Sequence, residues 1–226
     1  RTFSAVCCKP SYSNSLWYIK KSLILINNKL MKKHAEAIIP TPWGDFKMIA
    51  FADSEEEWMP HLALVHDSFD LTHKPILVRI HSECITGDLF GSKKCDCGEQ
   101  LKSSLDLLGR HKGILLYLRQ EGRGIGIINK LKAYNKQDEG LDTVEANVAL
   151  GLEVDYRQYE KAIEILKDLN VKRINLLTNN PDKIEAFEKT DIELIERIAL
   201  EIKATENNKR YLQTKKETLG HFLKDV

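Results

Sequence analysis

The sequence lacks an apolar run long enough to cross a membrane. The longest run near its start, Leu23 to Ile26, has four residues, whereas a spanning helix needs about 20. It also lacks an even set of cysteines, because the 226 residues contain five. An odd number of cysteines, not arranged like a disulfide framework, fits a reducing compartment. We therefore predict a cytoplasmic protein that has no membrane partner.

The sequence has little net charge, +1 at pH 7. Bulk charge therefore gives no argument for nucleic acid, and we predict no nucleic-acid partner. Acidic side chains are missing from residues 1–30, which carry five basic ones and leave 29 basic against 33 acidic side chains in residues 31–226. A mildly acidic protein that binds a polyanion must use local positive groups.

Residues 1–30 are serine-rich and lack helical or strand periodicity. Three interpretations stay open: the end of a transit peptide, which would imply a plastid protein, a tail or linker of a longer chain, or translated sequence upstream of a start at Met31. We favour the last. We predict that residues 1–34 form a tail and that residues 35–226 form one folded domain.

Hydrophobic patterns predict an α/β fold with mixed sheets, in which a strand-rich N-terminal part precedes alternating strands and helices. Three consecutive strands near the start favour antiparallel pairing. The predicted strands cover residues 46–53, 61–67, 75–82, 113–120, 171–177 and 191–200, and the predicted helices cover 97–113, 127–140, 156–169, 181–190 and 207–223.

Three cysteines follow the spacing C-x10-C-x-C: Cys84, Cys95 and Cys97. On an extended backbone the last two thiols point to the same side, and the ten-residue loop can fold Cys84 back to them. Three thiolates favour a soft metal, by default zinc. Because no fourth cysteine lies nearby in the sequence, an open coordination position is favoured over a site completed by His66 or His81. Three buried apolar thiols are the alternative.

The stretch RIHSEC-ITGD-x6-CDCGEQL resembles the signature of GTP cyclohydrolase II, the enzyme that opens GTP at the entry to riboflavin synthesis. RQEGRGIG, DTVEANVALG and LLTNNPDK resemble further motifs of that family in the same order, and the similarity runs from about Ile38 to His221. The resemblance implies that residues 35–226 form a catalytic domain. It also implies that the protein assembles as a homodimer.

The resemblance also implies the reaction. GTP and water would give formate, pyrophosphate and 2,5-diamino-6-(5-phosphoribosylamino)pyrimidin-4(3H)-one. One zinc ion per chain would activate the water that attacks the imidazole ring, and Mg²⁺ would accompany the triphosphate.

Several polar residues are candidates for binding GTP. Arg79, His81 and Glu83 alternate on the third predicted strand and share one face, although a surface ion pair would also explain Arg79 and Glu83. Asn180 before Pro181 predicts a helix N-terminus suited to an anion, with an ordinary strand–helix joint as the alternative. The resemblance implies that GTP contacts Arg79, His81, Ser82, Glu83, Gln100, Thr143, Thr178 and Lys183.

The glycine-rich stretch 121–126 differs from the dinucleotide fingerprint G-x-G-x-x-G, because its third glycine comes one residue early. Arg123 among glycines suits phosphate recognition, and Gly122 allows close backbone approach to a ligand. The Glu121 carboxylate fits guanine, because it can accept hydrogen bonds from the ring N–H and the amino group of that base. A plain tight turn is the alternative.

Three further residues are candidates for catalysis. From pattern alone, Tyr134 reads as a core aromatic, Asp155 as a helix N-cap with Gln158 three residues later, and Arg157 as a solvated charge. The resemblance implies instead that Tyr134 assists hydrolysis at the base, that Asp155 accepts a proton and that Arg157 attacks the α-phosphate. Because a guanidinium stays protonated, stabilisation of phosphate charge by Arg157 is an equal hypothesis.

A different class of function stays open: a zinc-stabilised nucleotide- or RNA-binding module without ring-opening activity. The basic helix predicted over residues 207–223 would supply its face. The lack of a fourth metal ligand at regular spacing and the near-neutral charge argue against this alternative.

Overall fold

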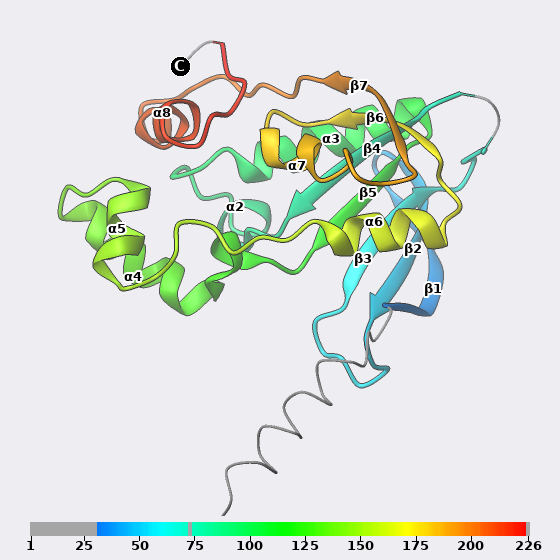
Figure 1. Ribbon diagram of the computed structural model, residues 1–226, viewed down its shortest axis with the longest axis horizontal. Coiled ribbons are helices and arrows are strands. Elements are labelled where there is room, and N and C mark those ends of the chain that lie inside the picture. The colour runs from blue at the N-terminus through cyan, green and yellow to red at the C-terminus, as the bar shows by residue number, and fades with distance from the viewer. Residues whose placement is uncertain (1–30, 72–73, 225–226) are drawn as a thin grey trace, which may run out of the picture. The chain divides into compact units, whose positions relative to one another are not determined.

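The computed structural model describes residues 31–71 and 74–224. In these residues the strands form one seven-stranded mixed sheet with the order β1-β2-β3-β5-β4-β6-β7 (Figure 1). The predicted α/β class, with a strand-rich N-terminal part before alternating strands and helices, is confirmed. The strands are β1 (Lys32–Thr41), β2 (Gly44–Ala52), β3 (His61–His66), β4 (Ile76–Ser82), β5 (Ile114–Leu118), β6 (Arg173–Leu177) and β7 (Glu193–Ile198).

The sheet has an antiparallel part and a parallel part. β1, β2, β3 and β5 pair antiparallel in that order, whereas β4 pairs parallel with β5 and β6, and β6 pairs parallel with β7. The predicted antiparallel pairing is confirmed for β2 and β3 but wrong for β4, because β5 lies between β3 and β4. A helical crossover between β4 and β5 allows these two strands to run parallel.

The helices connect the strands or gather beyond their ends (Figure 1). Helices are found in all five predicted ranges, although those predicted for 181–190 and 207–223 end at Glu185 and Glu217. The helices are α2 (Ile85–Asp88), α3 (Cys97–His111), the 3₁₀ turn η1 (Glu121–Gly124), α4 (Gly126–Asp138), α5 (Thr143–Ala149), α6 (Glu160–Asp168), α7 (Pro181–Glu185) and α8 (Lys209–Glu217).

Two hydrophobic cores lie on opposite faces of the sheet. On β5, Leu116 packs in a core with Leu166 of α6, whereas Leu115 packs in a second core with Leu108 of α3. Because alternate residues of a strand point to opposite faces, α6 and α3 cover opposite faces. β5 is therefore buried on both faces, as its continuous apolar run from Ile114 to Leu118 indicates.

The same alternation places polar residues of β4 on the α3 face. Val78 and Ile80 belong to the α6 core, and Leu77 belongs to the α3 core. Arg79 and His81 therefore share the face of Leu77, and both side chains are buried. The α3 face of β4 thus becomes polar toward the end of the strand, where α3 begins.

Two local predictions are wrong. The helix expected from Tyr156 begins at Glu160, and its N-cap is Tyr159 rather than Asp155. Helical periodicity also predicts Ile127, Leu131 and Tyr134 on the inward face of α4, which is incorrect in part, because Leu131 is 51% exposed while Lys130 and Ala133 are buried. In both segments, contacts from distant parts of the chain replace the local pattern.

The predictions for residues 1–30 lie outside the described residues. Residues 32–34, which the predicted tail includes, belong to β1 and pair with β2. No helix in the described ranges is long and apolar enough to span a membrane.

Candidate active site

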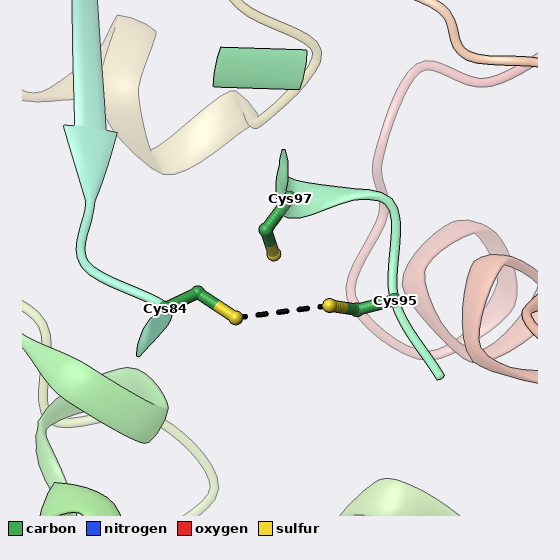
Figure 2. A group of neighbouring side chains, drawn as sticks. All are labelled: Cys84, Cys95 and Cys97. Atoms are coloured by element: carbon green, nitrogen blue, oxygen red, sulfur yellow. Dashed lines mark hydrogen bonds between the residues drawn. The ribbon is translucent and has the colours of Figure 1, made fainter. Parts of the chain in front are cut away.

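The three cysteines of the C-x10-C-x-C motif come together in space. Cys84 lies two residues after β4 and caps α2, Cys95 lies in the loop before α3, and Cys97 is the first residue of α3. Their sulfur atoms all lie within 4.8 Å of one another, and the Cys84 and Cys95 sulfurs are 3.7 Å apart. Figure 2 shows the three side chains directed toward a common point. The cluster can hold a metal ion.

Two glycines allow this convergence. A Cβ atom on Gly87 would lie 2.9 Å from the Cys95 sulfur and 3.2 Å from the Cys84 sulfur, and one on Gly98 would lie 2.2 Å from the Gly87 carbonyl oxygen. The turn α2 and the start of α3 can therefore touch only where both residues lack a side chain. The soft donor set fits zinc.

No histidine or carboxylate among the described residues joins the cysteine cluster. His66 lies at the end of β3, where its ring packs edge-on against Phe46. The His81 ring nitrogen Nε2 lies 3.1 Å from both carboxylate oxygens of Asp88. The geometry thus favours three protein ligands and an open position over completion by either histidine.

The thiols influence one another strongly. Hydrogen bonds from Cys95 and Cys97, helped by the charge of Lys130, lower the pKa of Cys84. The hydrogen bond with Cys84 and burial raise the pKa of Cys95 to about 11, and the same causes raise the pKa of Cys97. Cys84 is therefore the first to ionise, and a cation among the sulfurs would favour ionisation of the other two.

Lys130 of α4 connects the cysteine cluster with η1. Its ammonium group lies 3.0 Å from the Cys84 sulfur and donates to Glu121 Oε1 at 2.8 Å. The other oxygen of Glu121 accepts the backbone N–H of Ile85 at 2.6 Å. Both carboxylate oxygens of Glu121 thus have protein partners, and Glu121 does not line the adjoining cavity.

Tyr134 lies one turn further along α4, beside the cysteine loop. Its hydroxyl is 3.4 Å from Thr86 Oγ1, which is 3.6 Å from the Cys84 sulfur. Burial raises the pKa of Tyr134, so its hydroxyl stays protonated at neutral pH. The core interpretation of Tyr134 is wrong in one respect, because the ring lines the cavity.

Arg79 of β4 lines the cavity and is held by two hydrogen bonds. It donates to the Leu177 carbonyl at 3.0 Å and to Gln100 Oε1 at 2.6 Å. Gln100 in turn donates to Asp96, the residue between two of the cysteines, and Asp96 also accepts from Lys215 of α8 at 2.7 Å. This chain of contacts connects β4, the cysteine loop and the C-terminal helix.

His81 is oriented by an acid and a tyrosine. Asp88 accepts from the hydroxyl of Tyr117 at 2.9 Å and from the Cys84 backbone N–H at 3.0 Å, in addition to its contact with His81. Burial lowers the pKa of His81. The imidazole is therefore neutral at pH 7, with its Nε2 proton donated to Asp88, because a carboxylate only accepts.

The glycine-rich turn packs against the segment that contains Asp155 and Arg157. Gly122 and Arg123 both have φ of 61°, a left-handed conformation that costs a residue with a side chain free energy. The Arg123 carbonyl accepts the Tyr156 N–H at 2.9 Å, and a Cβ on Gly124 would lie 2.8 Å from the Tyr156 Cβ. Both terminal guanidinium nitrogens of Arg123 are buried without a hydrogen-bond partner in the described structure.

Asp155 binds Arg157 instead of capping a helix. Its carboxylate accepts from the Arg157 backbone N–H and from the guanidinium at Nε and at one terminal nitrogen. Burial opposes ionisation of Asp155, but the bonds and charge of Arg157 lower its pKa. Burial likewise opposes the Arg157 charge, yet the bond to Asp155 raises its pKa. Both groups are therefore charged at neutral pH.

The joint between β6 and α7 supplies further polar groups. Asn180 caps α7 through a bond from the Asp182 N–H, as predicted, and Thr178 Oγ1 accepts the Asn180 N–H at 3.0 Å. Lys183 is buried and donates to the Ile80 carbonyl at 2.8 Å. Burial and the charges of Arg79 and Arg157 lower its pKa well below the usual range.

One cavity brings the predicted residues together. Its lining includes every candidate except Glu121 and Asp155, each of which binds a neighbour of the cavity through its carboxylate. Thr143, the first residue of α5, is part of this lining. The sequence interpretation missed several further lining residues: Gln120, Lys130, Asn147, Tyr211, Lys215 and His221.

A sequence signal existed for two of these residues. Lys130 precedes Tyr134 by four positions, and Lys215 follows Tyr211 by four positions. Residues four apart lie on one face of a helix. Placing Tyr134 in the site would thus have indicated Lys130, whereas Tyr211 was itself not predicted to line the site.

Comparison with known proteins agrees with this geometry. The family model described as GTP cyclohydrolase II matches residues 32–199. The riboflavin biosynthesis protein RibBA of Bacillus cereus is 51% identical over 195 residues, and that of Bacillus subtilis is 49% identical over 195 residues. Each alignment covers 86% of this chain and 49% of the relative. The chain thus spans about half the length of the curated relatives it matches.

A solved structure gives a weaker match. The two-domain 3,4-dihydroxy-2-butanone 4-phosphate synthase RibBX of A. baumannii has 17% sequence identity and a TM-score of 0.44, over 83% of this chain and 48% of that protein. This likeness carries no argument. The family match and the close relatives do, and they show that the chain belongs to the GTP cyclohydrolase II family.

Proposed function

We propose that the chain is a GTP cyclohydrolase II that hydrolyses GTP to formate, pyrophosphate and 2,5-diamino-6-(5-phosphoribosylamino)pyrimidin-4(3H)-one, the first step of riboflavin biosynthesis. Family membership and similarity to RibBA proteins support this activity. The observation that carries the proposal is the shared cavity. Three cysteines line it together with three arginines and a lysine: Arg79, Arg123, Arg157 and Lys183.

Cys84, Cys95 and Cys97 would hold one zinc ion, as their soft donor set and close spacing suggest. When bound, zinc supplies Lewis acidity that makes water a nucleophile near neutral pH. Tyr134 lies beside this cluster with a protonated hydroxyl. It can donate a hydrogen bond to the base or give a proton to a ring nitrogen as the imidazole ring opens.

The cationic residues would bind the triphosphate and its Mg²⁺. Arg123 has two buried guanidinium nitrogens without hydrogen-bond partners in the described structure, which suits two phosphate oxygens. Lys183 lines the same cavity. The positive charges of Arg79 and Arg157 lower its pKa, which places it within electrostatic reach of both. Concentrated positive charge of this kind lowers the barrier to cleavage of the bond between the α- and β-phosphates.

For Arg157 we propose charge stabilisation rather than nucleophilic attack. The bond to Asp155 raises the Arg157 pKa, and a protonated guanidinium has no free electron pair for attack on phosphorus. Asp155 would hold Arg157 in place and could accept a proton only from a stronger acid, because its own pKa is lowered. The nucleophilic role implied by the resemblance stays a hypothesis.

Recognition of guanine would rest on residues other than Glu121. Both of its carboxylate oxygens are bonded within the protein, and we propose that it supports η1 and Lys130 instead. Its predicted contact with the base stays untested. Arg79, His81, Ser82, Glu83, Gln100, Gly122, Thr143 and Thr178 are proposed to contact GTP, and a homodimer is proposed as the assembly.

A mass balance tests the function. The full chain, loaded with zinc, is incubated with GTP and Mg²⁺, and formate and pyrophosphate are assayed together while mass spectrometry identifies the base product. Equal amounts of formate and pyrophosphate with the diaminopyrimidine are expected. Zinc-loaded protein that releases neither product but binds RNA would contradict the proposal and favour the binding-module alternative.

A further inference from the structure

Lys130 makes an unusual contact for a lysine. Its ammonium group lies 3.0 Å from the Cys84 sulfur, and its side chain is buried. No other hydrogen bond from a lysine or arginine to a sulfur is present in the described residues. The same ammonium group lies 2.8 Å from Glu121 Oε1. Lys130 therefore places a hydrogen-bond donor between a carboxylate and one metal-binding sulfur.

Contacts with Glu121 and Tyr134 hold the Lys130 ammonium group in position. Glu121 accepts from the ammonium at 2.8 Å, and the same carboxylate accepts the Ile85 N–H next to Cys84. The Lys130 nitrogen also lies 5.8 Å from the centre of the Tyr134 ring, at cation–π distance. Rotation of the lysine away from Cys84 would leave the buried Glu121 charge unpaired, which is costly.

Charge balance indicates what this contact does. A divalent ion with three thiolates has a net charge of −1, and each thiolate donates electron density that weakens Lewis acidity. A charge-assisted hydrogen bond to one sulfur withdraws part of that density. Partners in the outer shell of a metal site typically tune its ligands in this way.

We propose that Lys130 is a positioning residue of the metal site, which orients the Cys84 thiolate and weakens its donation to the metal, with Glu121 holding the lysine in place. The inference rests on the proposed zinc site. It assigns to Lys130 no contact with the reacting atoms, so its effect on ring opening is transmitted through Cys84.

The test uses Co²⁺ in place of zinc in the full chain, because sulfur-to-cobalt charge-transfer absorption reports on the thiolates directly. For Lys130→Met the absorption is expected to move to longer wavelength, since the sulfur becomes more electron-rich. Metal affinity is expected to fall by about 10- to 100-fold, as for other outer-shell changes. Lys130→Arg, which keeps a cationic donor, should restore most of the wild-type absorption.

Two further variants separate this role from a loss of folding. Lys130→Met combined with Glu121→Gln removes both buried charges, so it should fold and still show the shifted absorption. The matched control is Lys132→Met, which removes an exposed lysine of the same helix and should behave as wild type. Formate release by the zinc-loaded Lys130→Met protein should fall without a change in KM for GTP.

The outcomes are distinct. Wild-type protein that binds one Co²⁺ per chain, with an unchanged absorption maximum in both Lys130→Met proteins, would overturn the role of Lys130 and leave the proposed function intact. Wild-type protein that binds no metal at the cysteines would overturn the proposed zinc site and this inference with it. A shift in the variants that Lys130→Arg reverses would support the inference.

Discussion

The two sides of the cavity differ in how their polar groups are satisfied. Around the cysteines, Lys130, Glu121 and Asp88 all bond to protein groups. On the opposite side, buried nitrogens of Arg123 and Arg79 have no hydrogen-bond partner in the described structure. The charged groups of the first side are bonded before any substrate arrives, although the Nδ1 atom of His81 is also buried without a partner in the described structure. The second holds donors that gain partners only from a ligand, and an anionic ligand would satisfy most of them.

This contrast carries a physical lesson about which groups maintain the fold. A buried charge that bonds to protein stabilises the folded state, and its removal leaves a partner unsatisfied. A buried charge without a bonded partner opposes folding. The two sides should therefore respond differently to substitution.

The largest effect is expected on the cysteine side. Cys95→Ser removes one thiolate and should reduce formate release by about 1,000-fold or more, because metal activation contributes several kcal/mol to ring opening. Pyrophosphate release should decline far less, since the cations of the opposite side remain. Parallel assays of both products and of bound zinc measure this. Wild-type formate production by a metal-depleted Cys95→Ser protein would contradict the zinc role.

On the cationic side, Arg123→Met should raise the KM for GTP by about 10- to 100-fold, the value of one or two charge-assisted hydrogen bonds. Its melting temperature should stay equal or rise, because the folded protein loses an unbonded buried charge. Arg110→Met, which removes an exposed arginine paired with Asp106, is the control for both measurements. A clear fall in the melting temperature of Arg123→Met would remove the contrast between the two sides.

Lys215 of α8 connects the C-terminal helix to the cysteine loop. Its ammonium group donates to Asp96 Oδ1 at a distance of 2.7 Å. Lys215→Met leaves the buried Asp96 carboxylate with Gln100 as its remaining side-chain partner. The free energy of unfolding should fall by about 1–3 kcal/mol. Denaturant unfolding measures this, with Lys209→Met, an exposed lysine of α8, as the control. Equal stability of the two variants would mean that α8 is not anchored through Asp96.

The smallest effect concerns pH. Burial and neighbouring cations lower the pKa of Lys183, and a bound polyanion should raise it again, so GTP binding is expected to take up a proton. GTP affinity should then fall as pH rises, by up to about tenfold per pH unit for one proton. Calorimetry above about pH 7.5, where the terminal phosphate is ionised, measures the uptake. Lys183→Arg should abolish it, and persistence of the uptake in that variant would assign the proton elsewhere.

Local sequence patterns predicted elements well where nothing distant competed. The apolar run of β5 and the Asn180 cap of α7 are confirmed. A capping box forms at Asp142 and Glu145, where none was predicted, whereas the one considered at Asp155 does not form. At Asp155, the backbone of Gln158 bonds to the side chain of Gln120 instead. The Asp155 carboxylate accepts hydrogen bonds from Arg157.

The position of β4 could not be predicted from local pattern, because strand pairing depends on which distant strand is inserted beside it. The same limitation applies to Lys130 and Lys215, whose partners lie 46 and 119 residues away in the chain. Their burial follows from packing of α4 and α8 around the cavity. No local periodicity marks such contacts.

The sequence by itself determined the metal-binding motif, the order of the elements other than β1, α2 and α5, and the resemblance to a known family. Spacing and residue type suffice for these, because thiolate chemistry and helix or strand periodicity are local properties. Only the tertiary structure decided which charges are bonded to protein and which are left for a ligand. That distinction depends on burial and on partners supplied by remote segments, and these exist only once the chain is folded.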